Sequence, residues 1–170
     1  LFGHIDHRGA VINDKIVLNF FDSEQALQAA QSHLITAHPL QAAPVSTDVP
    51  LISNQEAYLN IALIKAYHEN LSRGQARRLA LEQLDRLGLA HIALRRNPSL
   101  TPEERFYVML LRAAMVRDAI LLIDQPFKMI PHLKNIASVR AVLKKIDDLY
   151  LSCHIFDYSW MKEKYSGEGL

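Results

Sequence analysis

The sequence has little of what marks several protein classes. It contains one cysteine, Cys153, so an internal disulfide framework is excluded and a reducing compartment is expected. No apolar run approaches the roughly 20 residues that a membrane-spanning helix needs. The net charge is only +1, so bulk electrostatics indicates neither a nucleic acid nor an acidic surface as partner. Because the first residue is Leu1 rather than methionine, one expectation is that the chain is a piece of a longer protein.

What is present has the composition of a soluble globular protein. Of its 170 residues, 49% are hydrophobic and 22% are charged, which allows one solid core. The most informative stretch is 119–127, AILLIDQPF, in which five apolar residues run into Asp124. Such a run predicts a strand buried on both faces of a parallel sheet. Asp124 then falls at the carboxyl end, where open α/β sheets bind ligands. A core strand followed by an exposed aspartate and a turn explains the run equally well.

Helix and strand signals surround this stretch. We predict strands within 11–21 and at 150–154, a loop at 36–50, and helices at 22–34, 54–70, 72–87 and from 101 onward. Ser23, Ser72 and Thr101 stand at N-cap positions, the last two in capping-box patterns. A further amphipathic helix is expected after Phe127, with apolar positions at Ile136, Val139, Val142, Leu143 and Ile146.

The segment LTPEERFYVMLLRAAMVRDAILLIDQPF resembles a block of the ATP-binding cassette (ABC) transporter ATPases. That family has an LSGGQ/E signature, an alanine-rich helix, and a buried strand ending in Asp-Glu-Pro. The segment 150–157, YLSCHIFD, resembles the following family strand with its switch histidine, and LISN at 51–54 is similar to a run in lipid-type importer ATPases. The resemblance covers about residues 50–157. Before that, only Leu1-Phe2-Gly3-His4 is similar to a family phrase that follows the phosphate-binding helix.

The resemblance implies an α/β fold: a partial P-loop NTPase-like core with a mostly parallel sheet, plus an inserted helical subdomain. Residues 1–50 would form the N-terminal part of the core, 51–99 the helical subdomain, and 100–170 the rest of the core. Leu71–Gln75 also looks like the signature. It lies too far from Asp124 and is better explained as a helix cap.

Several site residues follow from the resemblance. Asp124 matches the metal-associated aspartate, and Gln125 stands where the family has a catalytic glutamate. An amide cannot accept a proton at neutral pH, so general-base catalysis should be lost or badly reduced. His154 matches the γ-phosphate contact, although a strand-end histidine that bonds to a neighbouring backbone explains it too. Gln41 is the nearest candidate for the metal-sensing glutamine, although the residues favour an ordinary loop glutamine here.

The signature itself is altered at Thr101, Pro102, Glu103 and Glu104. In the family, two glycines there let backbone N–H groups approach ATP held by the partner subunit. Pro102 has no N–H to donate, and Glu103 adds negative charge where the phosphate would lie. These residues do make a good ordinary helix cap.

The phosphate-binding loop G-x-x-x-x-G-K-[ST] does not occur in the sequence. Without its backbone donors and lysine, an isolated chain loses most of its affinity for phosphate. ATP and Mg²⁺ are therefore implied as cofactors by resemblance, weakly held or not held by this chain. The histidines show no spacing typical of a zinc site.

Three functions remain open. The first is an ABC-type ATP-binding subunit with impaired catalysis, cytoplasmic and peripheral at the inner face of the membrane. It would be a structural or regulatory partner of a transmembrane subunit, as a homodimer or a heterodimer with an intact ATPase. The second is a fragment of an active ABC ATPase whose P-loop lies outside the chain. The third is a stand-alone α/β binding module unrelated to transport. No nucleic-acid partner is expected.

Overall fold

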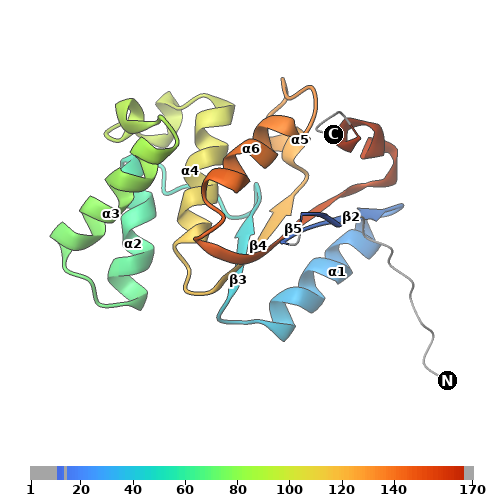
Figure 1. The fold of residues 1–170 in the computed structure, drawn as a ribbon, viewed down its shortest axis with the longest axis horizontal. Coiled ribbons are helices and arrows are strands. Elements are labelled where there is room, and N and C mark those ends of the chain that lie inside the picture. Colours follow the sequence, from blue (N-terminus) through green and yellow to red (C-terminus); the bar gives the residue numbers. More distant parts are fainter. Residues whose placement is uncertain (1–10, 14, 167–170) are drawn as a thin grey trace.

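A five-stranded sheet forms the centre of the computed structural model, which describes residues 11–13 and 15–166. The strand order is β1-β2-β5-β4-β3, and β1 pairs with β2 antiparallel while the other four strands are parallel (Figure 1). The bounds are β1 Val11–Asn13, β2 Ile16–Phe21, β3 Ala42–Val45, β4 Ala119–Asp124 and β5 Tyr150–Tyr158. The predicted α/β class with a mostly parallel sheet is confirmed.

The β4 strand lies inside the sheet, between β3 and β5. Its five apolar residues are all buried, whereas Asp124 at its end is half-buried. A strand with neighbours on both sides and helices on both faces has no polar environment, which explains why its apolar run is unbroken. The predicted buried strand is confirmed.

The prediction of a loop over 36–50 is wrong in part, because Ala42–Val45 form strand β3. The prolines at 39, 44 and 50 are typical of a loop, so the sequence pattern did not indicate this strand. Pro44 lies within β3, which is possible because β3 is the edge strand and one side of its backbone needs no partner.

Helices cover both faces of the sheet. Helix α1, Glu24–Ala37, packs on β2 and β5, with Leu27 in a small apolar cluster that includes Leu122 and Phe156. As predicted, Ser23 caps it by accepting from the Ala26 N–H. The larger cluster lies on the opposite face, under α4 (Pro102–Ala114) and α6 (Ala137–Lys145). The short segments α5 (Pro126–Met129) and η3 (Ser159–Tyr165) follow β4 and β5.

Two further helices pack against each other and against α4, at the end of the molecule away from α1 (Figure 1). They are α2, Ala57–His68, and α3, Arg73–Arg86, followed by short turns η1 (Ala90–Ile92) and η2 (Asn97–Ser99). Buried Asn60 fixes the entry into α2: its Oδ1 accepts from the Ile52 N–H at 2.8 Å, and its Nδ2 donates to carbonyls of the same loop. The predicted capping boxes at Ser72 and Thr101 are confirmed.

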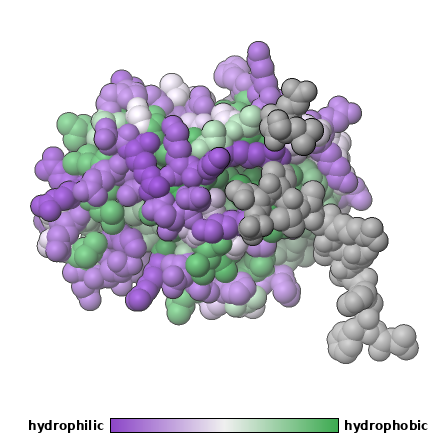
Figure 2. Space-filling model, in the orientation of Figure 1, coloured by the Kyte–Doolittle hydropathy of each residue, from purple (hydrophilic) through white to green (hydrophobic). Residues whose placement is uncertain are grey.

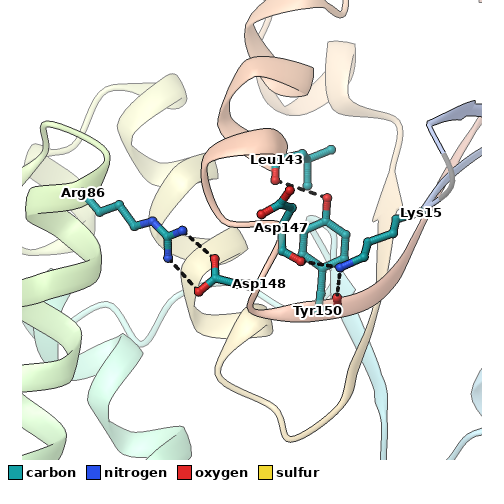
Figure 3. A network of polar contacts seen from close by, with 6 residues as sticks. All are labelled: Lys15, Arg86, Leu143, Asp147, Asp148 and Tyr150. Atoms are coloured by element: carbon teal, nitrogen blue, oxygen red, sulfur yellow. Dashed lines mark hydrogen bonds and ion pairs between the residues drawn. The ribbon is translucent and has the colours of Figure 1, made fainter.

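Polar contacts tie α3 to the sheet near the amino ends of the parallel strands (Figure 3). Arg86 at the end of α3 donates two hydrogen bonds to Asp148, at 3.1 and 2.5 Å. Beside it, Lys15 donates to the carbonyl of Asp147 at 2.6 Å, and the Tyr150 hydroxyl donates to the carbonyl of Leu143 at 3.2 Å. The turn between α6 and β5 is thereby held from two sides.

The surface is mostly hydrophilic, with apolar side chains scattered among polar ones on the face shown in Figure 2. Among the described residues, none of the helices has the length and hydrophobicity required to span a bilayer. The predicted family phrase Leu1–His4 lies outside the described residues.

Candidate functional site

The carboxyl ends of the parallel strands meet at one edge of the sheet. Asp124 closes β4, Asp157 lies near the end of β5, and Asp22 follows β2 directly. Open α/β sheets bind ligands at this edge because loops and helix N-termini converge there. We therefore take this edge as the candidate functional site.

Two side-chain amides contact the Asp124 carboxylate. The Nε2 of Gln31, on the inner side of α1, donates to its Oδ1 at 2.9 Å, and the Nε2 of Gln125 approaches the same oxygen at 3.4 Å. The backbone of Gln125 is left-handed, with φ 46°, and its N–H donates to the carbonyl of Phe156 at 2.9 Å. The predicted metal-associated Asp124 and its neighbour Gln125 thus lie together, with the amide turned onto the acid.

Asp157 is the most buried charged residue at this edge, with 2% of its surface exposed. Its Oδ2 accepts from the Tyr165 hydroxyl at 2.7 Å, and its Oδ1 accepts from the Tyr158 N–H at 2.8 Å. Burial raises the pKa of Asp157, and the negative charge of Asp124 adds to the increase, while the two hydrogen bonds oppose it. Tyr165 packs edge-on against Phe20 and Phe127, so η3 closes over this end of the sheet.

His154 does not reach this edge. It pairs with Leu122 in the middle of β5, whereas Asp124 pairs with Phe156, so His154 lies roughly 6–7 Å nearer the amino edge. Its ring stacks on Phe156 on the α1 face. Burial, and then the nearby His38, lower its pKa. The prediction of a strand ending at residue 154 made the histidine seem terminal, but β5 continues to Tyr158.

Gln41 is also separated from Asp124. It precedes β3, whose first residue Ala42 pairs with Ile120, so it lies at the amino edge of the sheet. Its backbone carbonyl accepts from the Ile120 N–H at 2.8 Å. The unrecognised strand β3 caused this misplacement, because a loop running from 36 to 50 would have left Gln41 free to reach the other edge.

The signature-like residues are occupied in their own helix cap. The Thr101 N–H donates to the Glu104 carboxylate at 2.8 Å, and the Glu104 N–H donates to the Thr101 hydroxyl at 3.1 Å. The backbone hydrogen bond from Thr101 is the main reason that the pKa of Glu104 is lowered, and Arg95 contributes at 3.7 Å. Glu103 accepts from the Tyr107 hydroxyl at 2.9 Å. Pro102 lines a cleft of about 360 Å³ between α4 and the segment after β4.

The connection between β2 and α1 is too short to be a phosphate-binding loop. A phosphate-binding loop joins a strand to the helix that follows it. Here β2 ends at Phe21 and α1 begins at Glu24, so Asp22 and Ser23 make the whole connection. Two residues without glycine cannot wrap a phosphate, and Ser23 already accepts from the helix N-terminus.

The chemistry of this edge is that of carboxylates and amides. Asp124 is the residue that could hold a divalent cation, since carboxylate oxygens are the preferred Mg²⁺ ligands. Across residues 11–13 and 15–166, no three His, Cys, Asp or Glu side chains gather in a way that could hold a metal ion. Asp124 alone would therefore depend on phosphate oxygens from a ligand to complete the coordination shell.

Sequence reasoning missed Gln31 and Tyr165, and it did not assign Asp157 a role. Gln31 lies one turn after Leu27, so the helical spacing of α1 could have placed it toward the sheet. Asp157 could have been found by extending the β5 pattern through Ile155 and Phe156. Tyr165 carried no such signal, because its burial depends on how η3 folds back.

Comparisons with known proteins support the fold. No known protein family matches the sequence, and no curated protein matches it either. Among solved structures, a dimeric post-hydrolysis state of the ATP-binding cassette MJ0796 bound to ADP and Pi is similar, with a TM-score of 0.55 and 22% identity over 76% of this chain. A second dimeric structure of MJ0796, a bacterial ABC transporter cassette, gives a TM-score of 0.57 and 19% identity. The chain has the fold of an ABC cassette. It spans 57% of the length of those chains.

Proposed function

We propose that the chain is an ABC-type ATP-binding subunit with an impaired catalytic apparatus, which acts as a structural or regulatory partner in a membrane transport complex. The observation that carries this proposal is the state of Asp124. Its Oδ1 is contacted by the amides of Gln31 and Gln125, where catalysis needs a free metal ligand beside a general base. The two-residue β2–α1 connection supports it independently.

Within this proposal, ATP and Mg²⁺ bind weakly or not at all. Phosphate binding in P-loop proteins depends on backbone N–H groups and a lysine. At the edge described here, Asp124 and Asp157 act electrostatically on each other, and their negative charge repels a polyphosphate, with Lys164 as the opposing positive charge near Asp157.

The partner is proposed to be a transmembrane subunit that binds the helical layer at 51–99, together with a second ABC ATPase subunit. The ABC-cassette fold supports this, since the similar MJ0796 structures are dimeric. The location that follows is the cytoplasmic face of the membrane. A turnover step would come from an intact second subunit.

The test is equilibrium binding of Mg-ATP to the purified chain by calorimetry. Asp124→Ala is the probe, and Glu82→Gln, at an exposed position of α3, is the control. We expect binding no tighter than millimolar, unchanged in both variants. Micromolar binding that Asp124→Ala abolishes would contradict the proposal and favour a fragment of an active ATPase.

A second arm measures phosphate release by wild type and Gln125→Glu. If the phosphate site is lost, restoring the acid leaves turnover undetectable. Turnover in Gln125→Glu would mean that only the base is missing. A chain that neither binds Mg-ATP nor associates with any ATPase or membrane subunit would instead fit the stand-alone binding module.

A further inference from the structure

The end of β5 carries a pair of stacked aromatic rings. Tyr158 and Trp160 lie with ring centroids 4.3 Å apart and planes inclined by 9°. Tyr158 packs on the apolar cluster under α1, and its N–H is held by Asp157. Trp160, the first-turn residue of η3 that follows it, keeps 66% of its surface exposed. In this stack the Tyr158 ring is held in place by packing, and the Trp160 indole is exposed to solvent.

Three carboxylates act electrostatically on Tyr158, the inner ring of this stack. Partial loss of solvent raises the pKa of Tyr158, and the carboxylates of Glu24, Asp124 and Asp157 raise it further. These acids come from three different elements: the start of α1, the end of β4 and the end of β5. Together they favour a positively charged group beside the rings.

The nearby cations of η3 face other rings. The Lys162 Nζ lies 5.5 Å from the centroid of Phe20, and the Lys164 Nζ lies 4.9 Å from that of Phe127. Within the described part of the chain, no lysine or arginine lies over Trp160. Tryptophan is the side chain that attracts cations most strongly through its ring face. The ring best suited to a cation is thus the one left open.

We propose that the Tyr158–Trp160 stack binds a small organic cation of the alkylammonium class. The indole face would contact the methyl or methylene groups that carry the charge, and the three carboxylates would supply the complementary field. A bare metal ion fits less well, because it needs a shell of oxygen ligands rather than a ring face. This inference does not depend on the proposed function.

The chain offers a direct readout, because Trp160 is its only tryptophan. The experiment titrates the protein with choline while following tryptophan emission, and repeats it with 3,3-dimethylbutan-1-ol, the neutral isostere of choline, at matched ionic strength. We expect choline to bind saturably and the neutral isostere to bind about tenfold more weakly, since only the cation is attracted by the ring face and the carboxylates. Equal responses to both, or none to choline, would overturn the proposal.

Two variants locate the site. Trp160→Leu should weaken binding, measured by saturation transfer from the choline methyl groups, by about five- to thirty-fold. Glu24→Gln, an exposed substitution that can still accept from Gln28, should weaken it about two- to five-fold, while Glu82→Gln on α3 should not change it. Adenosine tests a neutral planar ring, and binding of adenosine as tight as choline would also overturn the proposal.

Discussion

Replacing Tyr165 with phenylalanine tests the buried contact at the carboxyl edge. The substitution keeps the ring, with its edge-on contacts to Phe20 and Phe127, and removes only the hydroxyl that donates to Asp157 at 2.7 Å. A hydrogen bond to a charged group contributes about 1.5–3 kcal/mol. We therefore expect Tyr165→Phe to lower the free energy of unfolding by about that amount at neutral pH.

The pH dependence makes this prediction sharper. Burial raises the pKa of Asp157 above its ordinary 3.8, so the folded protein holds this proton more tightly than the unfolded chain does. The contribution of Asp157 to stability is therefore fully present below about pH 3.8 and is lost as pH rises through the raised folded pKa. Below that pKa the hydrogen bond joins two neutral groups, and the cost of Tyr165→Phe should fall to about 1 kcal/mol.

Urea denaturation at neutral and acidic pH measures both effects. Tyr67→Phe, which removes an exposed hydroxyl on α2, is the matched control and should leave stability unchanged. Asp157→Asn should remove the pH dependence of the Tyr165→Phe cost. A cost below about 0.5 kcal/mol at neutral pH, or the same cost at both pH values, would refute the reasoning.

Two further predictions concern other parts of the molecule. The side chains of the Arg86–Asp148 pair are 35% and 56% exposed. A double-mutant cycle with Arg86→Met and Asp148→Asn should therefore give a coupling energy of only about 0.2–1 kcal/mol, which added salt reduces. A larger coupling energy that does not depend on salt would contradict this. Cys153 is fully buried and burial raises the pKa of its thiol, so a thiol reagent at mildly alkaline pH should modify it only as fast as the protein unfolds, and rapid labelling of the folded protein would disprove that.

Local signals in the sequence predicted the elements well. The apolar run before Asp124 identified β4, and Ser23, Ser72 and Thr101 marked three helix starts that the structure confirms. Each of these depends on neighbours within a few residues. A cap bonds to its own first turn, and a central strand shows its burial in its own composition.

What failed depended on pairing across the sheet. Pro44 argued against a strand at 42–45, and only the position of β3 at the sheet edge makes that strand possible. That error moved Gln41 to the wrong edge. His154 was misplaced because pairing with β2 extends β5 as far as Tyr158. Register between distant segments leaves little trace in either segment alone.

Parallel pairing brings the carboxyl ends of β2, β5 and β4 together at one end of the sheet. Acidic side chains lie at that end of the sheet, whereas phosphate binding needs positive charge and N–H donors. Asp22 and Ser23 stand in the strand–helix connection, two amides approach Asp124, and Asp157 is buried under Tyr165. The carboxylates there would repel a polyphosphate and attract a cation, and Lys164 is the positive charge that opposes them near Asp157. The proposed loss of phosphate binding and the proposed cation site therefore predict opposite results for the ATP and choline titrations.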